Sequence, residues 1–335
     1  MLRLPRLRVD PRRSCPLRAA NRGGAPETTI GGRGVSAQLT RRRFLAISAA
    51  VLVGPSAPTA RAAPVTWRGF ALGAEARLTI HAPPQLASRA IAAALSQLRQ
   101  AEQLFSLYDP ASVLSRLNRA GVLQSPPPPF LDLARLCTRM HAATAGIFDP
   151  SVQPLWQAAA RGEDISKAAR LAGWHKVSVT AQEIRLAPGQ ALTFNGIGQG
   201  YATDMVRAAL GRLGLKQVLV NAGEFAALGG PFRVGLADPK HGVFTARSLT
   251  GGAVATSSPG ALRLRGAAHI LHPTIDRRPQ WATVSTEATS AALADAASTA
   301  FCLMNESEIT AALARLPAGS KANLLAEDGS LKTLG

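Results

Sequence analysis

The feature that most restricts the possible fold is a glycine-rich segment deep in the chain. It reads Phe194-Asn195-Gly196-Ile197-Gly198-Gln199-Gly200-Tyr201-Ala202-Thr203-Asp204. A strand is expected to end before the glycines and a helix to begin with them, so that free N–H groups at the helix start can hold phosphate oxygens. The G-x-G-x-G spacing and the late position in the chain argue against a Rossmann fingerprint. A tight glycine turn without a ligand is the alternative that this segment alone leaves open.

The helical and strand patterns predict an α+β fold, because they are mixed without regular alternation. Strands are expected at 65–81 with a break at Gly73, at 176–186 as a hairpin, at 190–194 and at 217–220. Helices are expected at 84–107, 131–145, 200–213 and 288–304. The run Pro126–Pro129 is interpreted as a rigid connector.

The first 62 residues are predicted to be a disordered export leader that takes no part in the fold. Residues 40–45 match the twin-arginine pattern, and the apolar run at 44–53 is shorter than the ~20 residues that a membrane span needs. Ala60-Arg61-Ala62 fits an A-x-A cleavage site. These features predict cleavage near Ala62, a mature domain over 63–335 and a periplasmic location. A basic disordered arm is the alternative.

Without this leader the chain is only mildly basic. The whole sequence has 38 basic and 20 acidic residues, and the first 62 residues hold 12 and 2 of them, which leaves 26 and 18. The remaining part has no basic run with interleaved aromatic residues, so nucleic-acid binding is not indicated. A mild positive charge suits an anionic dinucleotide or an acidic partner surface.

The sequence argues against zinc and against a disulfide framework. His269 and His272 have an H-x-x-H spacing, but zinc takes three or four nitrogen or sulfur ligands and no cysteine pair supports these histidines. The cysteines of the expected domain are Cys137 and Cys302, each in an apolar helical stretch. In an oxidising compartment the two could form a disulfide, but no feature of the sequence brings them together, so we expect buried free thiols.

The expected late helix carries two oxygen ligands on one face. Asp295 and Thr299 are four residues apart, so their side chains stack. A carboxylate and a hydroxyl are hard ligands that suit Mg²⁺, which also keeps waters and substrate phosphate oxygens. Small neighbours at Ala291, Ala294 and Ser298 leave room for a diphosphate. The alternative left open is a solvated Asp295 and a Thr299 that bonds back to its own helix.

The glycine-rich segment and four further blocks resemble, in order along the chain, the motifs of the ApbE family. The further blocks are Ser106-Leu107-Tyr108 with Ser112, Ser115, Arg116, Leu117 and Asn118; Gly146-Ile147-Phe148-Asp149-Pro150-Ser151-Val152; Val254-Ala255-Thr256-Ser257 with His269-Ile270-Leu271-His272-Pro273; and Ala294-Asp295-Ala296-Ala297-Ser298-Thr299-Ala300. The resemblance implies an ApbE-like α+β fold with mixed or antiparallel sheets and flanking helices. It also implies two fused lobes with a flavin site between them.

The same resemblance implies a Mg²⁺-dependent enzyme that cleaves FAD and joins the FMN half to a threonine of another protein. Asp295, Thr299 and the backbone carbonyl of Gly198 are the implied metal ligands, and His269 is the implied general base, so that His269 and Asp295 are the candidate catalytic residues. The candidate cofactor-binding residues are Ser106, Tyr108, Asp149, Asn195, Gly196, Gly198, Gln199, Gly200, Glu224, Thr256 and Ser257.

Several positions depart from the family pattern. Gln199 stands where many members have lysine, Ser258 where a glycine is usual, and His272 where an aspartate is usual. Residues 72–74 replace Met-Gly-Thr with Leu-Gly-Ala, and Ala222 replaces a glycine. The glutamine is also similar to a subgroup associated with nitrous oxide reductase maturation.

Three functions are compatible with these residues, and we expect the first. It is transfer of FMN from FAD to a threonine of an exported or membrane electron-transfer protein, with release of AMP. The second is an FAD pyrophosphatase, in which water is the nucleophile and the products are FMN and AMP. The third is an FAD-binding maturation factor with little catalysis, which the departures at Gln199 and His272 keep open.

Overall fold

The computed structural model describes residues 63–274 and 277–335. The predicted leader and its cleavage site therefore lie outside the described residues. Within the described part, no helix combines the length and the hydrophobicity that a membrane crossing requires.

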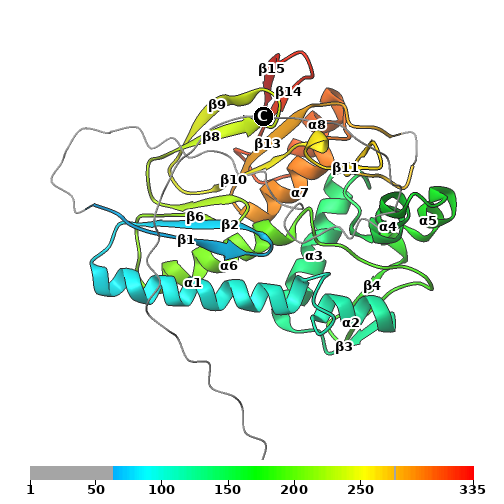
Figure 1. The fold of residues 1–335 in the computed structure, drawn as a ribbon, viewed down its shortest axis with the longest axis horizontal. Helices are drawn as coiled ribbons and strands as arrows, with labels where there is room; N and C mark the ends of the chain where they lie inside the picture. Colours follow the sequence, from blue (N-terminus) through cyan, green and yellow to red (C-terminus); the bar gives the residue numbers. More distant parts are fainter. Residues whose placement is uncertain (1–62, 275–276) are drawn as a thin grey trace, which may run out of the picture. The chain divides into compact units, whose positions relative to one another are not determined.

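An eight-stranded sheet is the framework of the fold (Figure 1). Its strands lie in the order β1-β2-β6-β7-β10-β13-β14-β15, and every neighbouring pair is antiparallel. Their bounds are β1 Val65–Ala71, β2 Ala74–Ile80, β6 Val218–Asn221, β7 Phe225–Leu228, β10 Ala253–Ser257, β13 Thr283–Ala288, β14 Lys321–Leu325 and β15 Leu331–Leu334. The smaller sheets are formed by β8 Phe232–Asp238 with β9 Gly242–Leu249, by β11 Arg263–Leu264 with β12 Ala267–Ala268, and by β3 Val122–Gln124, β5 Glu183–Arg185 and β4 Ser178–Val179.

Helices flank the sheet and form most of the chain between β2 and β6. The α-helices are α1 Pro84–Phe105, α2 Val113–Ala120, α3 Pro128–Ala143, α4 Gln153–Arg161, α5 Ile165–Leu171, α6 Gly198–Arg212, α7 Ala291–Phe301 and α8 Glu306–Leu313. Short 3₁₀ turns occur at Pro150–Val152, Trp174–Lys176 and Pro259–Ala261. The predicted α+β class with antiparallel sheets is thus confirmed.

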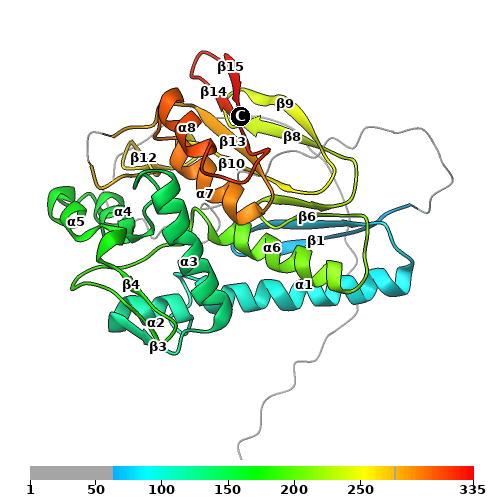
Figure 2. The ribbon, with the colours of Figure 1, turned by 180° about the vertical axis from the view of Figure 1, so that it is seen from behind.

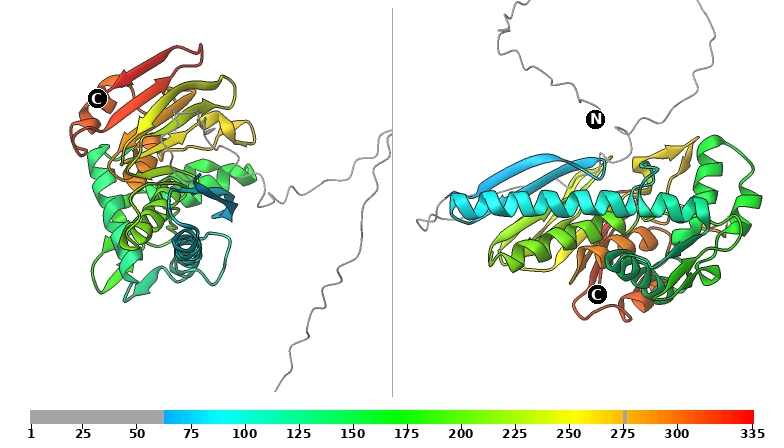
Figure 3. Two further views of the ribbon diagram at one scale, coloured as in Figure 1. Left: turned by 90° about the vertical axis from the view of Figure 1, so that its left-hand side faces the viewer. Right: turned by 90° about the horizontal axis from the view of Figure 1, so that it is seen from below.

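The middle of the sheet is buried on both faces. Helices α1 and α6 lie side by side against one face (Figure 3), and the β8–β9 hairpin packs against the other. In β6, Val218 and Val220 belong to the apolar cluster formed with α1 and α6, and Leu219 belongs to the cluster formed with the β8–β9 hairpin. Burial on both sides explains the uninterrupted apolar run of this strand.

Helix α7 packs on β10 and β13 and beside α6 (Figure 2). Its buried residues are mostly small: Ala291, Ala292, Ala294, Asp295, Ala296, Ala297, Ser298, Ala300 and Phe301. Small side chains allow the helix axis to approach both the sheet and α6 closely, which brings the polar residues of α7 to the end of β10.

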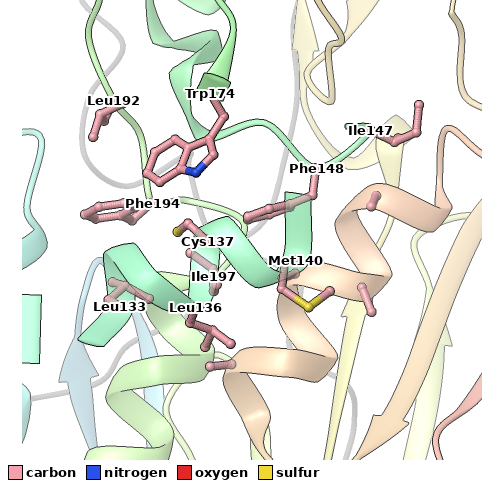
Figure 4. Close-up of a cluster of buried hydrophobic side chains, with 14 of the residues drawn as sticks. Leu133, Leu136, Cys137, Met140, Ile147, Phe148, Trp174, Leu192, Phe194 and Ile197 are labelled. Carbon is pink, nitrogen blue, oxygen red and sulfur yellow. The ribbon is translucent and has the colours of Figure 1, made fainter. Parts of the chain in front are cut away.

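A large apolar cluster connects α3 to the loops around it. In Figure 4, Cys137 and Met140 of α3 lie close to Phe148 and Phe194 from two loops and to Trp174 from a 3₁₀ turn. The cluster fixes the chain just before the glycine-rich turn, because Phe194 belongs to it. Both cysteines of the domain are buried and free, which confirms the prediction made for them.

Most expected elements are confirmed, with two changes at their ends. The late helix is shorter than 288–304, because Ala288 ends β13 and Ser290 caps α7 by accepting a hydrogen bond from the N–H of Leu293. The prediction of a proline connector was wrong in part: Pro128 and Pro129 form the first turn of α3. Proline is tolerated there because the first helical N–H groups have no intrahelical acceptor.

The prediction of a strand at 190–194 was wrong. The segment has no paired strand in the described structure, and a side chain takes the place of one. Asn118 donates from Nδ2 to the carbonyl of Leu192 at 2.9 Å and accepts from the N–H of Leu192 at 2.7 Å. The N–H of Thr193 donates to the carbonyl of Pro150 at 2.8 Å.

Candidate active site

A cavity of about 600 Å³ opens where the ends of several elements meet. Its walls come from the β1–β2 turn, the loop after α1, the glycine-rich turn, the β6–β7 turn, the end of β10 and one face of α7. The predicted site residues that line it are Ser106, Tyr108, Asp149, Asn195, Gly196, Gly198, Gln199, Glu224, Thr256, Ser257, His269, Asp295 and Thr299. Gly200 is the predicted site residue that does not line it. A cavity of this size can enclose a large part of a nucleotide-sized ligand.

The glycine-rich turn packs directly against α7. The N–H groups of Ile197 and Gly198 both donate to the carbonyl of Phe194, at 3.1 and 2.6 Å, which closes the turn before α6. A Cβ atom at Gly196 would lie 2.9 Å from Oγ1 of Thr299. Glycine at this position therefore lets the backbone approach the Thr299 hydroxyl. Because the strand pairs described are antiparallel, the turn does not belong to a Rossmann βαβ unit.

Helices α6 and α7 each contribute a carboxylate that accepts hydrogen bonds from N–H groups in the first turn of the other helix. Asp295 of α7 accepts a hydrogen bond from the N–H of Gly200 at 3.0 Å, and Asp204 of α6 accepts from the N–H groups of Ala291 and Ala292 at 3.0 and 2.9 Å. Each carboxylate satisfies backbone donors that the start of the opposite helix leaves free. These hydrogen bonds hold Asp295 beside the glycine-rich turn.

Two buried carboxylates lie in the cavity wall. Asp295 is only 3% exposed, and burial raises its pKa to about 7. Burial, and then the charge of Asp295, raise the pKa of Glu224 well above its usual range. Among the described residues, neither carboxylate forms an ion pair with a lysine or arginine. Buried carboxylates in such surroundings favour binding of a cation, and the alternative of a solvated Asp295 is excluded.

Three hydroxyl groups, from the end of β10 and from α7, lie close together. The Oγ atom of Ser257 lies 2.8 Å from Oγ of Ser298 and 3.3 Å from Oγ1 of Thr299. The described residues contain no cluster of three or more His, Cys, Asp and Glu side chains that could hold a metal. A cation here would therefore bind a carboxylate, hydroxyls, a backbone carbonyl and ligand oxygens, which is a donor set suited to a hard divalent ion.

His269 is held by backbone carbonyls on one side of its ring. Its Nδ1 atom lies 3.2 Å from the carbonyl oxygens of both Pro259 and Leu262. Two acceptors at Nδ1 fix the tautomer that carries its proton there, which leaves Nε2 as the nitrogen with a free lone pair. Burial lowers the pKa of His269, so the ring is neutral at physiological pH. A neutral imidazole in a cavity wall can accept a proton from a ligand hydroxyl.

His272 has a different environment, and its hydrogen-bond partners are not those of His269. Its Nδ1 accepts from the N–H of Thr274 at 3.0 Å, so its proton is on Nε2, which faces the carbonyl of Gly146 at 3.4 Å. Both ring nitrogens are engaged with the backbone. His272 thus supports the loop next to the cavity.

Two of the predicted binding residues use their side-chain oxygens within the protein. Asp149 accepts from the N–H and Oγ of Ser151 at 2.8 and 2.6 Å, and from the N–H of Trp174 at 3.0 Å. Ser106 accepts from the N–H groups of Tyr108 and Asp109, both at 3.1 Å. These oxygens shape the loops of the cavity wall.

The comparison with known families agrees with this geometry. The ApbE family model matches residues 72–324. The chain belongs to the ApbE family. A curated ApbE-type relative, the FAD:protein FMN transferase of Rhodobacter capsulatus, is 28% identical over 322 residues, and the match covers 87% of this chain and 61% of that protein. The chain thus spans less than two thirds of the relative's length.

Solved structures of ApbE proteins share the fold. The flavin transferase ApbE from Vibrio cholerae superposes with a TM-score of 0.70 at 18% identity, covering 81% of this chain and 96% of its own. The flavinyl transferase ApbE of Pseudomonas stutzeri gives 0.70 at 23% identity, covering 81% and 94%. The ApbE protein of Thermotoga maritima gives 0.72 at 22% identity, covering 80% and 96%.

Within this ApbE-family chain, Gln199 presents a donor at the position where the family pattern has lysine. Its Nε2 atom is buried and has no hydrogen-bond partner within the described structure. Gly223, at φ +103°, makes room for it, because a Cβ there would lie 2.8 Å from Cδ of Gln199. A buried donor without an acceptor is costly, so this amide is available to a ligand acceptor.

The rim of the ApbE-type cavity is aromatic and polar. Tyr108 is 54% exposed, and partial burial raises its pKa. An aromatic ring in this position can stack on a planar ligand. Asn195 is exposed at the same rim, next to the glycine-rich turn.

Sequence reasoning missed Asp204 and Ser298 as residues of the site. Both residues belong to ApbE-like segments, but the sequence predicts no role for Asp204 and treats Ser298 as a small neighbour of the metal site. The signal for Asp204 was its place in the second turn of a helix, opposite a second helix that begins with alanines. Which helix it faces is a long-range property that the sequence does not state.

Replacing Asp204 with alanine is expected to lower the free energy of unfolding by about 1–3 kcal/mol. The change leaves the N–H groups of Ala291 and Ala292 without the Asp204 carboxylate as acceptor, and it removes the ion pair of Asp204 with Arg207 at 2.9 Å. Urea unfolding measures the effect. Asp132→Ala, at an exposed position of α3, is the matched control and should change stability by less than about 0.5 kcal/mol. Equal effects of the two substitutions would contradict the assignment.

Proposed function

We propose that this chain is a Mg²⁺-dependent FAD:protein FMN transferase, which moves FMN from FAD to a threonine of an acceptor protein and releases AMP. The observation that carries the proposal is the contact of α7 with the glycine-rich turn: Asp295 bonds to Gly200, and Thr299 lies against Gly196. The name of the Rhodobacter capsulatus relative supports the same activity.

The residues present fit a magnesium ion, because the donor set combines a buried carboxylate with hydroxyl and carbonyl oxygens. Asp295, Thr299 and the carbonyl of Gly198 would hold it. When bound, Mg²⁺ would neutralise charge on the diphosphate and make the phosphorus on the FMN side more electrophilic. Nε2 of Gln199, a buried donor without a hydrogen-bond partner in the described structure, would donate a hydrogen bond to the substrate as a neutral substitute for a lysine cation.

His269 accepts the proton of the acceptor threonine at Nε2. The threonine oxygen forms a bond to the phosphorus on the FMN side, and the bond from that phosphorus to the bridging oxygen breaks. AMP leaves with the bridging oxygen, and the proton stays on His269 until it exchanges with solvent. The backbone carbonyls of Pro259 and Leu262 hold the ring in one tautomer during this step.

We further propose that the acceptor is an exported loop of a membrane electron-transfer subunit and that transfer takes place in the periplasm. The twin-arginine pattern at residues 40–45 supports this location. A role in nitrous oxide reductase maturation rests on Gln199 alone and stays a prediction.

Removal of the metal tests the proposed chemistry. The full chain is incubated with FAD, MgCl₂ and an acceptor domain, and covalent flavin on the acceptor is followed by in-gel fluorescence and mass spectrometry, with AMP measured by chromatography. EDTA is expected to lower the transfer at least about a hundredfold, because several kcal/mol of charge stabilisation is lost, and excess MgCl₂ to restore it. An acceptor whose threonine is replaced by valine is the control.

The other candidate functions give different products in the same assay. AMP and FMN released at an undiminished rate without any labelled acceptor would identify an FAD pyrophosphatase. Tight FAD binding without AMP release would identify a binding factor. Either result would contradict the proposal.

A further inference from the structure

A chain of buried hydrogen bonds lies next to the active site and has no part in the mechanism above. It links Asp238 at the end of β8, Thr283 at the start of β13 and Ser258 just after β10. Oγ1 of Thr283 lies 2.5 Å from Oδ2 of Asp238 and 2.5 Å from Oγ of Ser258. All three side chains are buried, and Asp238 is only 6% exposed. A buried carboxylate in this position needs an explanation.

The direction of these hydrogen bonds follows from the charge of Asp238. Burial raises the pKa of this carboxyl, but hydrogen bonds from Thr283, His241 and Lys240 outweigh burial and leave the pKa below its usual value. An ionised carboxylate only accepts hydrogen bonds, so the hydroxyl of Thr283 donates to Asp238. The oxygen of Thr283 is then the acceptor for the hydroxyl of Ser258, and the orientation of the Ser258 side chain is fixed.

Ser258 begins the turn that holds the catalytic histidine. The N–H of Ala261 donates to the carbonyl of Ser258 at 3.0 Å, which closes a 3₁₀ turn over Pro259–Ala261. The carbonyls of Pro259 and Leu262, within and directly after this turn, are the two acceptors for Nδ1 of His269. A displacement of Ser258 would therefore move both acceptors of His269.

We propose that Asp238, Thr283 and Ser258 are positioning residues that fix the tautomer and orientation of His269 through the turn at Pro259–Ala261. The proposal deepens the proposed function and rests on the role given there to His269. Ser258 stands where the family pattern has glycine, which has no hydroxyl, so the anchor is a property of this chain.

The test removes the hydroxyl of Thr283 without changing the size of the side chain. In Thr283→Val, kcat for FMN transfer is expected to fall about ten- to hundredfold, by analogy with residues that orient metal-binding histidines, while KM for FAD changes less than about twofold. Thr283→Ser, which keeps the hydroxyl, should restore most of the rate. Thr286→Val is the matched control: Thr286 is buried on the same strand, and its hydroxyl has no hydrogen-bond partner within the described structure. It should leave kcat unchanged.

A second comparison separates positioning from a general structural effect. If Thr283 acts through His269, Thr283→Val should cause no further loss of rate in the His269→Ala background. Equal losses in both backgrounds, or equal rates of Thr283→Val and Thr286→Val, would overturn the proposal.

The third measurement does not depend on activity. In ¹⁵N NMR of the full chain, His269 should show the tautomer protonated at Nδ1 in the wild type and in Thr286→Val, and a mixture of tautomers in Thr283→Val. Unchanged ring signals in Thr283→Val would also overturn the proposal. A wild type that transfers no FMN would refute the proposed function instead, whereas the ring signals would still decide whether these three residues position the histidine.

Discussion

Replacing Asp295 with asparagine is expected to abolish the proposed FMN transfer and, at the same time, to stabilise the metal-free protein at pH 8. If Asp295 binds the proposed Mg²⁺, its loss removes several kcal/mol of transition-state stabilisation, which corresponds to a decrease in rate of about a thousandfold. The fold is expected to tolerate the change, because the amide oxygen of asparagine can still accept the hydrogen bond from Gly200. Activity and stability should therefore change in opposite directions.

The gain in stability comes from the cost of burying a charge. Burial raises the pKa of Asp295 from 3.8 to about 7, which means that the ionised form is disfavoured in the folded protein. Protonated Asp295 therefore contributes to the stability of the wild type, fully below about pH 4. This contribution is lost as the pH rises through 7, because Asp295 ionises in the folded protein, whereas asparagine does not titrate. The difference should be near zero at pH 4 and grow to as much as about 4 kcal/mol at pH 8.

Urea unfolding in EDTA at several pH values, together with the transfer assay, measures both effects. Addition of MgCl₂ should stabilise the wild type and leave the variant unchanged, because the proposed metal site requires the Asp295 carboxylate. Asp132→Asn on the surface of α3 is the control and should change neither quantity. The role proposed for Asp295 would be ruled out if the variant transferred FMN at the wild-type rate. It would also be ruled out if the stability of the variant relative to wild type were lower at pH 8 than at pH 4.

The parts of the site that the sequence predicted are those that depend on local geometry. Asp295 and Thr299 are one helical turn apart, so the helix period alone places them on one face, and both line the cavity. The glycine-rich turn before α6 was predicted on similar grounds, because glycine spacing controls how closely the backbone can approach its surroundings.

The parts that the sequence did not predict depend on contacts between distant segments. Asn118 replaces a strand partner for Leu192 across 74 residues, and the bond from Gly200 to Asp295 spans 95 residues. Patterns of apolar residues specify an extended segment, but they do not specify whether a strand or a side chain satisfies its backbone groups. The anchoring of Ser258 by Thr283 is hidden for the same reason.

Gly200 makes a packing contact that the sequence did not predict. It was predicted to bind the cofactor as part of the glycine-rich segment, but it does not line the cavity. A Cβ atom at this position would lie 2.3 Å from the carbonyl oxygen of Ala291 and 2.8 Å from Cα of Ala292. Both atoms belong to the backbone of α7 and cannot rotate away. The structure therefore assigns Gly200 to the close approach of the two helices that carry the site.

Replacing Gly200 with alanine is accordingly expected to push α7 away from α6. Overpacking of this kind lowers the free energy of unfolding by about 1–3 kcal/mol. The hydrogen bond from the Gly200 N–H to Asp295 would lengthen, and a displacement of about 1 Å in a catalytic group can reduce the transfer rate a hundredfold.

The same substitution at Gly211, on the same helix, should have the opposite effect on stability. Gly211 is exposed, and the atoms nearest to its expected Cβ are the Cδ atoms of Leu228, at 3.9 and 4.0 Å. Alanine should stabilise this helical position by about 0.5–1 kcal/mol, because glycine loses more backbone entropy on folding. The free energy of unfolding in urea and the transfer rate are measured for both variants, Gly200→Ala and Gly211→Ala. If Gly200→Ala were as stable and as active as Gly211→Ala, the helices would not need their close contact, and the geometry proposed for the metal site would lose its main support.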